Sequence, residues 1–191
     1  FLRDKADRSL RTPDDIIRRI GIPMIGTTTS SAHIDRESLP EYVANDYQTI
    51  RANLGLISGG EIPKKLVVTS AAMGDGKTTF AINLATSLAK AGDRVLLIDG
   101  DIRKPDIGRI LHLPDIRWGL ADVLLGLSEF QEALYSMPQH GLEVLANDGR
   151  NVSRTIDVLG KPQTAECLNA ICQNYDHIVI DTSPVLSSPD A

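Results

Sequence analysis

The sequence predicts an α/β fold in three layers, with a mostly parallel central sheet covered by helices on both faces. Two observations carry this prediction. Short, uniformly apolar runs alternate along the chain with longer segments of helical pattern, as expected for parallel strands buried on both faces. A glycine-rich stretch, SAAMGDGKTT, joins one such run to a helix. A chain of 191 residues with 42% hydrophobic residues is large enough for one compact core.

The first part of the chain is predicted to be a linker, residues 1–37, that leads into a folded domain, residues 38–191. A helix is expected from Thr12, a possible cap followed by proline, to Gly21, which can end it. Residues 26–37 (GTTTSSAHIDRE) are polar and typical of a linker. The run SLPE at 38–41 forms a capping box, so a helix is expected from there to about residue 57.

The remaining elements are predicted in alternation. Strands are expected at 66–70, 95–98, 142–145 and 177–180, all of them buried and apolar. Helices are expected at 78–91, where Gly92 ends the segment, and at 163–175. Short helices broken by Gly119 and Gly126 are expected within 105–135.

Composition excludes several function classes. A net charge of −5 gives no sign of a nucleic-acid binder. We find no signal peptide and no apolar run long enough to span a bilayer. The two cysteines, Cys167 and Cys172, are expected to be ordinary buried thiols, and the four histidines lack metal-ligand spacing, so no zinc site is expected. Because the chain starts at Phe1 and stops soon after a motif, we expect a fragment whose domain is truncated at its C-terminal end.

The glycine-rich stretch matches the phosphate-binding signature G-x-x-x-x-G-K-[ST], with Ala71 in place of the first glycine. Its glycines allow backbone N–H groups to cradle a phosphate at a helix N-terminus. The alternative is a glycine-rich turn with an exposed lysine, but a strand before it and a helix after it favour a phosphate site and a P-loop NTPase fold. The predicted nucleotide-binding residues are Met73, Gly74, Asp75, Gly76, Lys77, Thr78 and Thr79.

Two further motifs place carboxylates at the ends of predicted strands. In VLLIDGDIRKP, Asp99 and Asp101 would repel each other unless a cation lies between them or one acts as a base. In HIVIDTSP, Asp181 is a candidate partner for Mg²⁺, to which Thr78 can also contribute its hydroxyl. A capping aspartate and a surface aspartate would explain the first motif equally well, and the second motif taken alone is weak. Together the three motifs predict a phosphoryl-transfer site for ATP and Mg²⁺.

The motifs AAMGDGKT, LLIDGDIR at 96–103 and IVIDTSP at 178–184 resemble those of bacterial tyrosine kinases, the P-loop type that regulates capsule and exopolysaccharide assembly. The resemblance covers nearly the whole chain. It implies that Lys77 binds phosphate, that Thr78 and Asp181 hold Mg²⁺, that Asp99 and Asp101 serve the base and the metal, and that Arg103 helps position the active loop. The implied reaction is ATP-dependent phosphorylation of tyrosine, often on the tail of a neighbouring subunit.

The same resemblance implies a location and partners. The segment LRDKADRSLRTPDDIIRRIGIPMIG is similar to the one that follows the second transmembrane helix in such kinases, whereas its charge alone favours a solvated helix face. The kinase would therefore lie at the cytoplasmic face of the bacterial inner membrane. Its partners would be a second copy of the chain, protein-tyrosine substrates and a transmembrane polysaccharide co-polymerase domain on the same or a separate chain. No nucleic acid is expected.

The sequence departs from the family in two places. The ring-forming element E-x-x-R-x-x-R corresponds to NDYQTIR at 45–51, in which Arg51 alone is kept. The family's tyrosine cluster near the C-terminus has no counterpart in this sequence. The tyrosines that are present, predicted to be packing residues rather than substrates, are Tyr42, Tyr47, Tyr135 and Tyr175.

Two other functions compete with the kinase. A partitioning or cell-division ATPase has the same core but a second lysine early in the loop, where this chain has Ala72. A nucleotide-gated regulator of a polysaccharide co-polymerase would bind nucleotide without transferring phosphate. The intact lysine and aspartates argue against a dead site.

Overall fold

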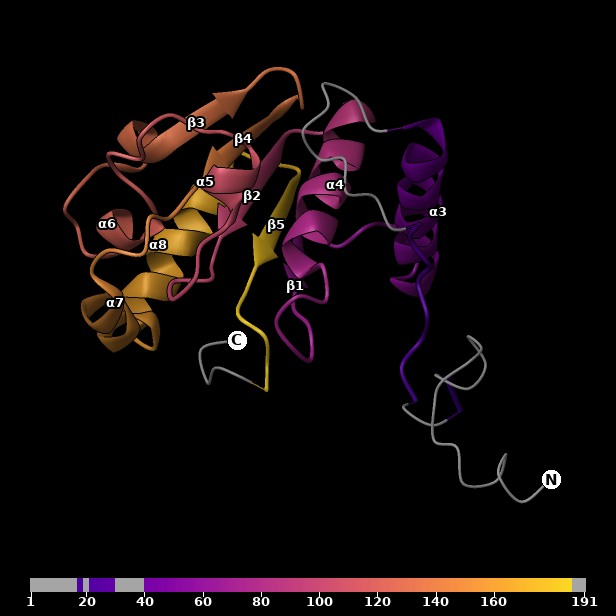
Figure 1. Ribbon diagram of the computed structural model, residues 1–191, viewed down its shortest axis with the longest axis horizontal. Helices are drawn as coiled ribbons and strands as arrows, with labels where there is room; N and C mark the ends of the chain where they lie inside the picture. The colour runs from indigo at the N-terminus through magenta and orange to yellow at the C-terminus, as the bar shows by residue number, and fades with distance from the viewer. Residues whose placement is uncertain (1–16, 19–20, 30–39, 187–191) are drawn as a thin grey trace.

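The computed structural model describes residues 17–18, 21–29 and 40–186 (Figure 1). Strands and helices alternate through most of this part of the chain. The elements are α3 (Glu41–Ile57), β1 (Lys65–Val68), α4 (Lys77–Lys90), β2 (Val95–Asp99), α5 (Ile107–Ile110), α6 (Leu120–Leu124), the 3₁₀ helix η1 (Phe130–Ala133), β3 (Leu134–Met137), β4 (Leu142–Leu145), α7 (Val152–Leu159), α8 (Pro162–Cys172) and β5 (His177–Asp181).

The described strands form one sheet in the order β1-β5-β2-β4-β3. The first four strands in this order are parallel, and β3 is antiparallel to β4. The register pairs Asp99 of β2 with Asp181 of β5, and Asp181 with Val68 of β1. The carboxyl ends of three neighbouring strands therefore meet at one edge, where ligands bind in sheets of this type.

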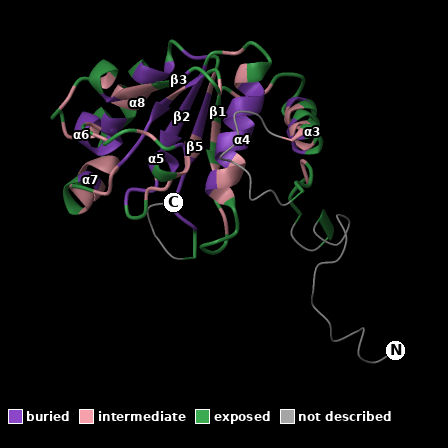
Figure 2. Ribbon diagram, turned by 45° about the horizontal axis from the view of Figure 1, so that its top comes forward, coloured by how far each residue is buried: buried purple, intermediate pink, exposed green. Residues whose placement is uncertain are grey.

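The sheet separates two apolar cores, which confirms the three-layer α/β prediction. Val95 and Leu97 of β2 pack on one face with α3 and α4, whereas Leu96 and Ile98 pack on the other with α6 and α8. Figure 2 shows the buried strands between these helices, and Figure 1 shows α3 beside α4 at the end of the molecule away from β3. Burial on both faces explains why β2 is apolar throughout.

Two sequence predictions about the sheet and its helices were wrong, and one helix was not predicted. The first strand is not fully buried: β1 lies at the sheet edge, its exposure alternates, and the Val67 side chain is 62% exposed. Residues 134–137 form β3, the antiparallel strand at the opposite edge, although the short helices were predicted to extend to residue 135. Residues 152–159 form α7, for which no element was predicted.

The segment that precedes α3 lies along this helix. Thr29 donates its backbone N–H to Asp46 at 2.8 Å, and the Asn53 amide donates to the carbonyl of Ile25 at 2.9 Å. The predicted end of the first helix is confirmed, because Gly21 has φ +72° and its N–H bonds the carbonyl of residue 17 at 2.9 Å. The rest of that helix and Ser38 of the capping box lie outside the described residues, and α3 as described begins at Glu41 without a side-chain cap.

The tyrosines are mostly packing residues, as predicted. Tyr47 and Tyr175 are buried, and the half-buried Tyr135 donates its hydroxyl to the carbonyl of residue 118. Tyr42 differs, since it is 51% exposed on α3. Cys172 is buried and Cys167 half-buried, and both are free thiols. Within the described ranges, no helix combines the length and apolarity that crossing a membrane requires.

Candidate active site

The phosphate-binding loop connects β1 to α4 and is braced by its own side chains. Gly76 has φ +84° and precedes the first residue of α4, so a side chain there would force the backbone into strain. The Asp75 carboxylate accepts the N–H of Ala72 at 2.9 Å, and the Ser70 hydroxyl donates to the Ala72 carbonyl at 2.8 Å. The loop is therefore held in shape from within, with its helix N-terminus facing the edge where the strands end.

Lys77 and Thr78, the first residues of α4, contact the aspartate at the end of β5. The Thr78 hydroxyl donates to the Asp181 carboxylate at 2.7 Å, and the Lys77 ammonium lies 3.3 Å from the same group. The Lys77 ammonium also lies 3.3 Å from Asp101, in the loop after β2. The side chain of Asp181 is fully buried, and that of Lys77 is 12% exposed. Three motifs that are separate in sequence thus form one cluster.

Asp101 is held at this cluster by three groups. Its Oδ1 accepts the hydroxyl of Ser183 at 2.8 Å and the backbone N–H of Lys104 at 3.1 Å, while Oδ2 faces the Lys77 ammonium. Its residue exposure is 4%. A carboxylate fixed in this way beside the phosphate-binding lysine can accept a proton from a hydroxyl group that approaches a bound phosphate.

Asp99 has a different environment, although it lies only two residues away. Its Oδ2 accepts the N–H of Ile107 at 3.0 Å, its Oδ1 accepts the N–H of Asp101 at 3.3 Å, and the side chain is inaccessible to solvent. Burial raises the pKa of Asp99 to about 8, although the two N–H donors oppose the shift. Asp99 therefore fixes the path of the loop after β2. Its predicted catalytic and metal roles stay predictions.

Gly100 explains the spacing of the two aspartates. Its N–H donates to the carbonyl of Asp181 at 2.8 Å, and a Cβ at this position would lie 2.8 Å from the same oxygen. Only glycine allows the chain to pass so close to the end of β5. The D-G-D sequence thus directs one carboxylate inward and the next toward Lys77.

The oxygen atoms of this cluster fit Mg²⁺. Burial raises the pKa of Asp181, and the bond from Thr78 and the charge of Lys77 oppose this shift. No group of three or more His, Cys, Asp or Glu side chains in the described residues could hold a metal ion alone. Mg²⁺ commonly uses one or two protein oxygens together with phosphate and water oxygens. Thr78 and Asp181 could supply the protein ligands.

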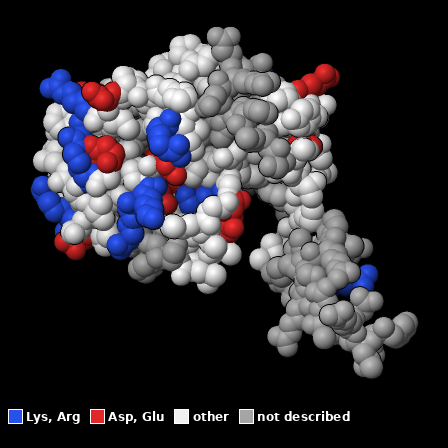
Figure 3. Space-filling model, in the orientation of Figure 1, with Lys and Arg blue, Asp and Glu red and all other residues white. Residues whose placement is uncertain are grey.

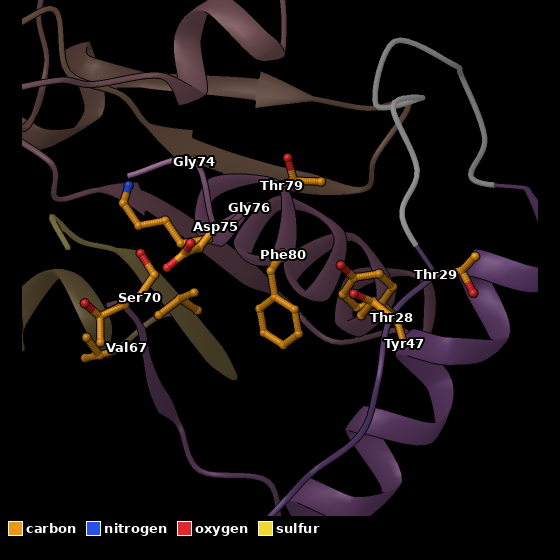
Figure 4. A pocket seen from close by; sticks show the side chains of 13 residues that line it. Thr28, Thr29, Tyr47, Val67, Ser70, Gly74, Asp75, Gly76, Thr79 and Phe80 are labelled. Atoms are coloured by element: carbon orange, nitrogen blue, oxygen red, sulfur yellow. The ribbon is translucent and has the colours of Figure 1, made fainter. Parts of the chain in front are cut away.

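Two cavities open on opposite sides of the phosphate-binding loop. The first, about 680 Å³, lies between the loop, β1, α3 and residues 28–29, and is lined in part by the aromatic rings of Tyr47 and Phe80 (Figure 4). These rings are 5.5 Å apart, centre to centre. The second cavity, about 460 Å³, lies between the loop and α5, and its polar lining includes Lys77, Thr78 and Asp101. The first combines two aromatic rings with polar residues of the loop, and the second carries several charged side chains.

The structure brings together most of the predicted site residues. Direct contacts join four of them: Lys77, Thr78, Asp101 and Asp181. Asp99 instead accepts the backbone N–H of Ile107. The loop residues Met73, Gly74, Asp75, Gly76 and Thr79 line one or both cavities. Arg103 is exposed and lies outside the lining of the second cavity. Sequence reasoning missed Ser183, Lys104 and Arg109, although Ser183 lies within the motif HIVIDTSP, Lys104 lies within VLLIDGDIRKP and Arg109 follows the latter by four residues.

Comparisons with known proteins place this chain among relatives of known name. A family model described as AAA domain (AAA_31) matches residues 64–189. The tyrosine-protein kinase YwqD of Bacillus subtilis (strain 168) is 35% identical over 148 residues, 78% of this chain and 62% of YwqD. The crystal structure of the chimerical protein CapA2B2 has a TM-score of 0.80 and 31% identity, and the match covers 94% of this chain and 78% of that one.

A more distant likeness is to the septum site-determining protein MinD of Pyrococcus horikoshii, which was solved in complex with Mg-ADP. Its TM-score is 0.54 at 27% identity, and the match covers 62% of this chain and 48% of MinD. The fold is thus shared with proteins that carry two different kinds of name, kinase and cell-division protein.

Proposed function

Since this chain belongs to the AAA_31 family of AAA domains, we propose that it is an ATP-dependent protein-tyrosine kinase. The observation that carries the proposal is the contact of Lys77 with both Asp101 and Asp181, beside the hydroxyl of Thr78. This arrangement combines a phosphate-binding cation, oxygen ligands for a metal and a fixed carboxylate. The likeness to YwqD, named as a tyrosine-protein kinase, supports the choice of acceptor.

In the proposed reaction, the tyrosine hydroxyl oxygen forms a bond to the γ-phosphorus of ATP. The bond between this phosphorus and the β,γ-bridging oxygen breaks, and ADP leaves with that electron pair. Asp101 accepts the proton of the tyrosine hydroxyl, and Lys77 stabilises the negative charge of the transferred group. Mg²⁺, held by Thr78 and Asp181, would neutralise charge on the phosphate oxygens. Ser183 orients Asp101 through its hydrogen bond of 2.8 Å.

We assign the two cavities to the two substrates. The cavity that Phe80 and Tyr47 line receives the nucleoside part of ATP, because aromatic rings offer favourable contact to a base. The charged cavity between the loop and α5 receives the acceptor tyrosine, because Asp101 lines it. In this assignment the phosphates lie at the helix N-terminus between the two cavities.

The chain spans 62% of the length of YwqD, so the activity, substrates and partners of a whole protein are part of this proposal. We propose that phosphorylation takes place on tyrosines of a second copy and of other proteins, and that it regulates capsule or exopolysaccharide assembly at the cytoplasmic face of the bacterial membrane. Residues 1–37 would connect the domain to a transmembrane co-polymerase. The motif resemblance supports this part of the proposal.

The test is to incubate the protein with ATP, Mg²⁺ and a tyrosine-containing copolymer, beside a Lys77→Met variant. Phosphotyrosine is mapped by mass spectrometry, and free phosphate is measured in the same samples. We expect phosphotyrosine in the wild type, at least 100-fold less in the variant, and little free phosphate. Phosphate release without phosphotyrosine would favour an ATPase of the MinD type, for which the likeness to MinD is the supporting observation and Ala72 the opposing one. Nucleotide binding without either product would favour a regulator.

A further inference from the structure

Two cationic side chains stand at the cavity that we assign to the acceptor. Lys104, in the loop after β2, and Arg109, on α5, line the cavity of about 460 Å³ together with Lys77 and Asp101. Both are exposed. Lysine and arginine side chains (blue) lie on the face of the molecule that carries α5 and the neighbouring loops, with acidic side chains (red) beside them (Figure 3).

The ammonium group of Lys104 has no carboxylate partner among the residues that the structure describes. Within the described residues it contacts the thioether sulfur of Met73 at 3.6 Å rather than a carboxylate. Sulfur is a weak acceptor, so this contact positions the side chain without neutralising it. Because Met73 belongs to the phosphate-binding loop, the Lys104 side chain reaches from the loop after β2 to the other wall of the cavity. Its backbone N–H meanwhile bonds Asp101.

Arg109 also keeps most of its donors. Its Nε lies 3.0 Å from Oδ1 of Asp106, in a pair whose side chains are 73% and 47% exposed. Exposed pairs of this kind are weak and easily exchanged for another anion. The bond to Asp106 uses Nε. The two Nη groups can therefore donate to a carboxylate or a phosphate.

Lys77 within the site differs from Lys104 and Arg109 at the cavity mouth in the groups that it faces. Lys77 is matched by Asp101 and Asp181 within the site, where it faces the phosphates of ATP. An anionic peptide that approaches ATP would be repelled by these phosphates. Cations at the cavity mouth would reverse this repulsion and favour an acceptor that carries negative charge.

We propose that Lys104 and Arg109 form an anion-binding position that selects tyrosines flanked by an acidic or phosphorylated side chain. The anion, a carboxylate or a phosphate monoester, would bind the two cations while the tyrosine hydroxyl reaches Asp101. The inference rests on the proposed kinase function and adds the chemical class of its acceptor. A phosphorylated neighbour would make one phosphorylation event promote the next.

The test uses three peptides that share one tyrosine and differ in its neighbours: glutamates, one phosphotyrosine, or glutamines. Steady-state kinetics are measured with the wild type and with a Lys104→Met/Arg109→Met variant. The matched control is Lys64→Met/Lys90→Met, which removes two exposed lysines from the opposite end of the domain: Lys64 directly precedes β1, and Lys90 ends α4 about 20 Å along the helix from Lys77. Methionine keeps most of the length of each side chain.

We expect the wild type and the control to show a KM for one or both anionic peptides about tenfold below that for the glutamine peptide. The double variant should lose this preference, with KM for ATP and kcat on the glutamine peptide changed less than twofold. The glutamate and phosphotyrosine arms identify which anion is bound. An equal KM for all peptides in the wild type would overturn the proposal, as would a raised KM for ATP in the double variant with peptide preference retained.

A binding measurement keeps this inference separate from the kinase proposal. Fluorescence anisotropy of the three labelled peptides is recorded with the wild type and both variants, in the presence of Mg²⁺ and a non-hydrolysable ATP analogue. If no peptide is phosphorylated but the anionic peptides bind through Lys104 and Arg109, the kinase proposal fails and the anion-binding position stands. If phosphorylation proceeds without any charge preference, the kinase proposal stands and this inference fails.

Discussion

The two sides of the phosphate-binding loop differ in how their residues are held. On the side of β2 and β5, buried carboxylates, a lysine and two hydroxyl groups contact one another directly. On the side of α3, an open cavity lies between the loop and a helix that packs on α4 through buried apolar side chains and a few polar bonds, among them one from Arg51 to the carbonyl of Ser87. The arrangement for chemistry is thus built into the core, whereas the opposite wall depends on a helix at the end of the domain.

The largest expected effect comes from Asp101, the proposed base. Asp101→Asn keeps an acceptor for Ser183 and Lys104 but cannot take up the tyrosine proton, so kcat for tyrosine phosphorylation should fall about 10³-fold. The affinity for a fluorescent ATP analogue should change by less than about threefold. A variant with undiminished kcat would exclude Asp101 as the base.

Because Asp99 is buried on the side of β2 and β5, we expect the free energy of unfolding to depend on pH. Its pKa is raised to about 8 from an ordinary value of 3.8, so the folded state holds a proton that the unfolded state has lost. This contribution is fully present below pH 4 and is lost as the pH rises through 8. Without nucleotide and with a metal chelator, the free energy of unfolding should decline between pH 5 and pH 8 by an amount on the order of 3 kcal/mol.

Urea denaturation at several pH values checks this expectation. The Asp99→Asn variant serves as the comparison, because its side chain does not titrate. Its unfolding free energy should decline less over the same range, and Asp181, whose pKa burial also raises, would contribute to the remaining slope. Equal slopes for the two proteins would show that other groups carry the pH dependence.

The close approach at Gly100 gives the third effect. In Gly100→Ala the new methyl group would meet the Asp181 carbonyl oxygen at 2.8 Å, and a backbone atom cannot move aside without displacing β5. We expect a loss of about 2–3 kcal/mol in unfolding free energy. Gly160→Ala is the matched control, since φ is −80° and no neighbouring atom lies within 4 Å there, and it should change stability by less than about 0.5 kcal/mol. Similar losses in both would refute the steric argument.

The smallest expected effect concerns α3, on the other side of the phosphate-binding loop. Arg51→Met keeps the apolar stem but removes the bond from α3 to the carbonyl of Ser87, which should cost about 1–2 kcal/mol of unfolding free energy. Gln48→Met, on the exposed surface of the same helix, should be nearly neutral. If α3 forms the nucleoside wall, Arg51→Met should also raise KM for ATP while kcat stays constant. An unchanged KM would remove α3 from the nucleotide site.

Sequence patterns predicted the parts of this molecule that local chemistry determines. The strand–loop–helix context of the phosphate-binding signature and the aspartates at strand ends were sufficient to bring Lys77, Thr78, Asp101 and Asp181 into one site. The different environments of Asp99 and Asp101 were not predictable, because they depend on Gly100 passing close to β5, a contact between segments about eighty residues apart.

Other features were missed for similar reasons. The exposure of β1 and the antiparallel direction of β3 follow from their positions at the two sheet edges, and strand order leaves no mark in a run of four residues. By the motif resemblance, Arg51 corresponds to the last arginine of the ring-forming element E-x-x-R-x-x-R. In this structure its guanidinium donates to the carbonyl of Ser87 in the same chain. The sequence shows that the arginine is present, but only the fold shows that it bonds the carbonyl of Ser87.

The chain that leaves β5 is bonded to β1 and to the beginning of the phosphate-binding loop. The N–H of Thr182 donates to Val68 at 3.0 Å, and the N–H of Val185 donates to Ser70 at 3.0 Å. These two amide protons can exchange with deuterated solvent only when the segments separate. Their exchange rates therefore measure how often the unliganded loop comes apart from its neighbour, and a nucleotide that closes the loop should slow both together.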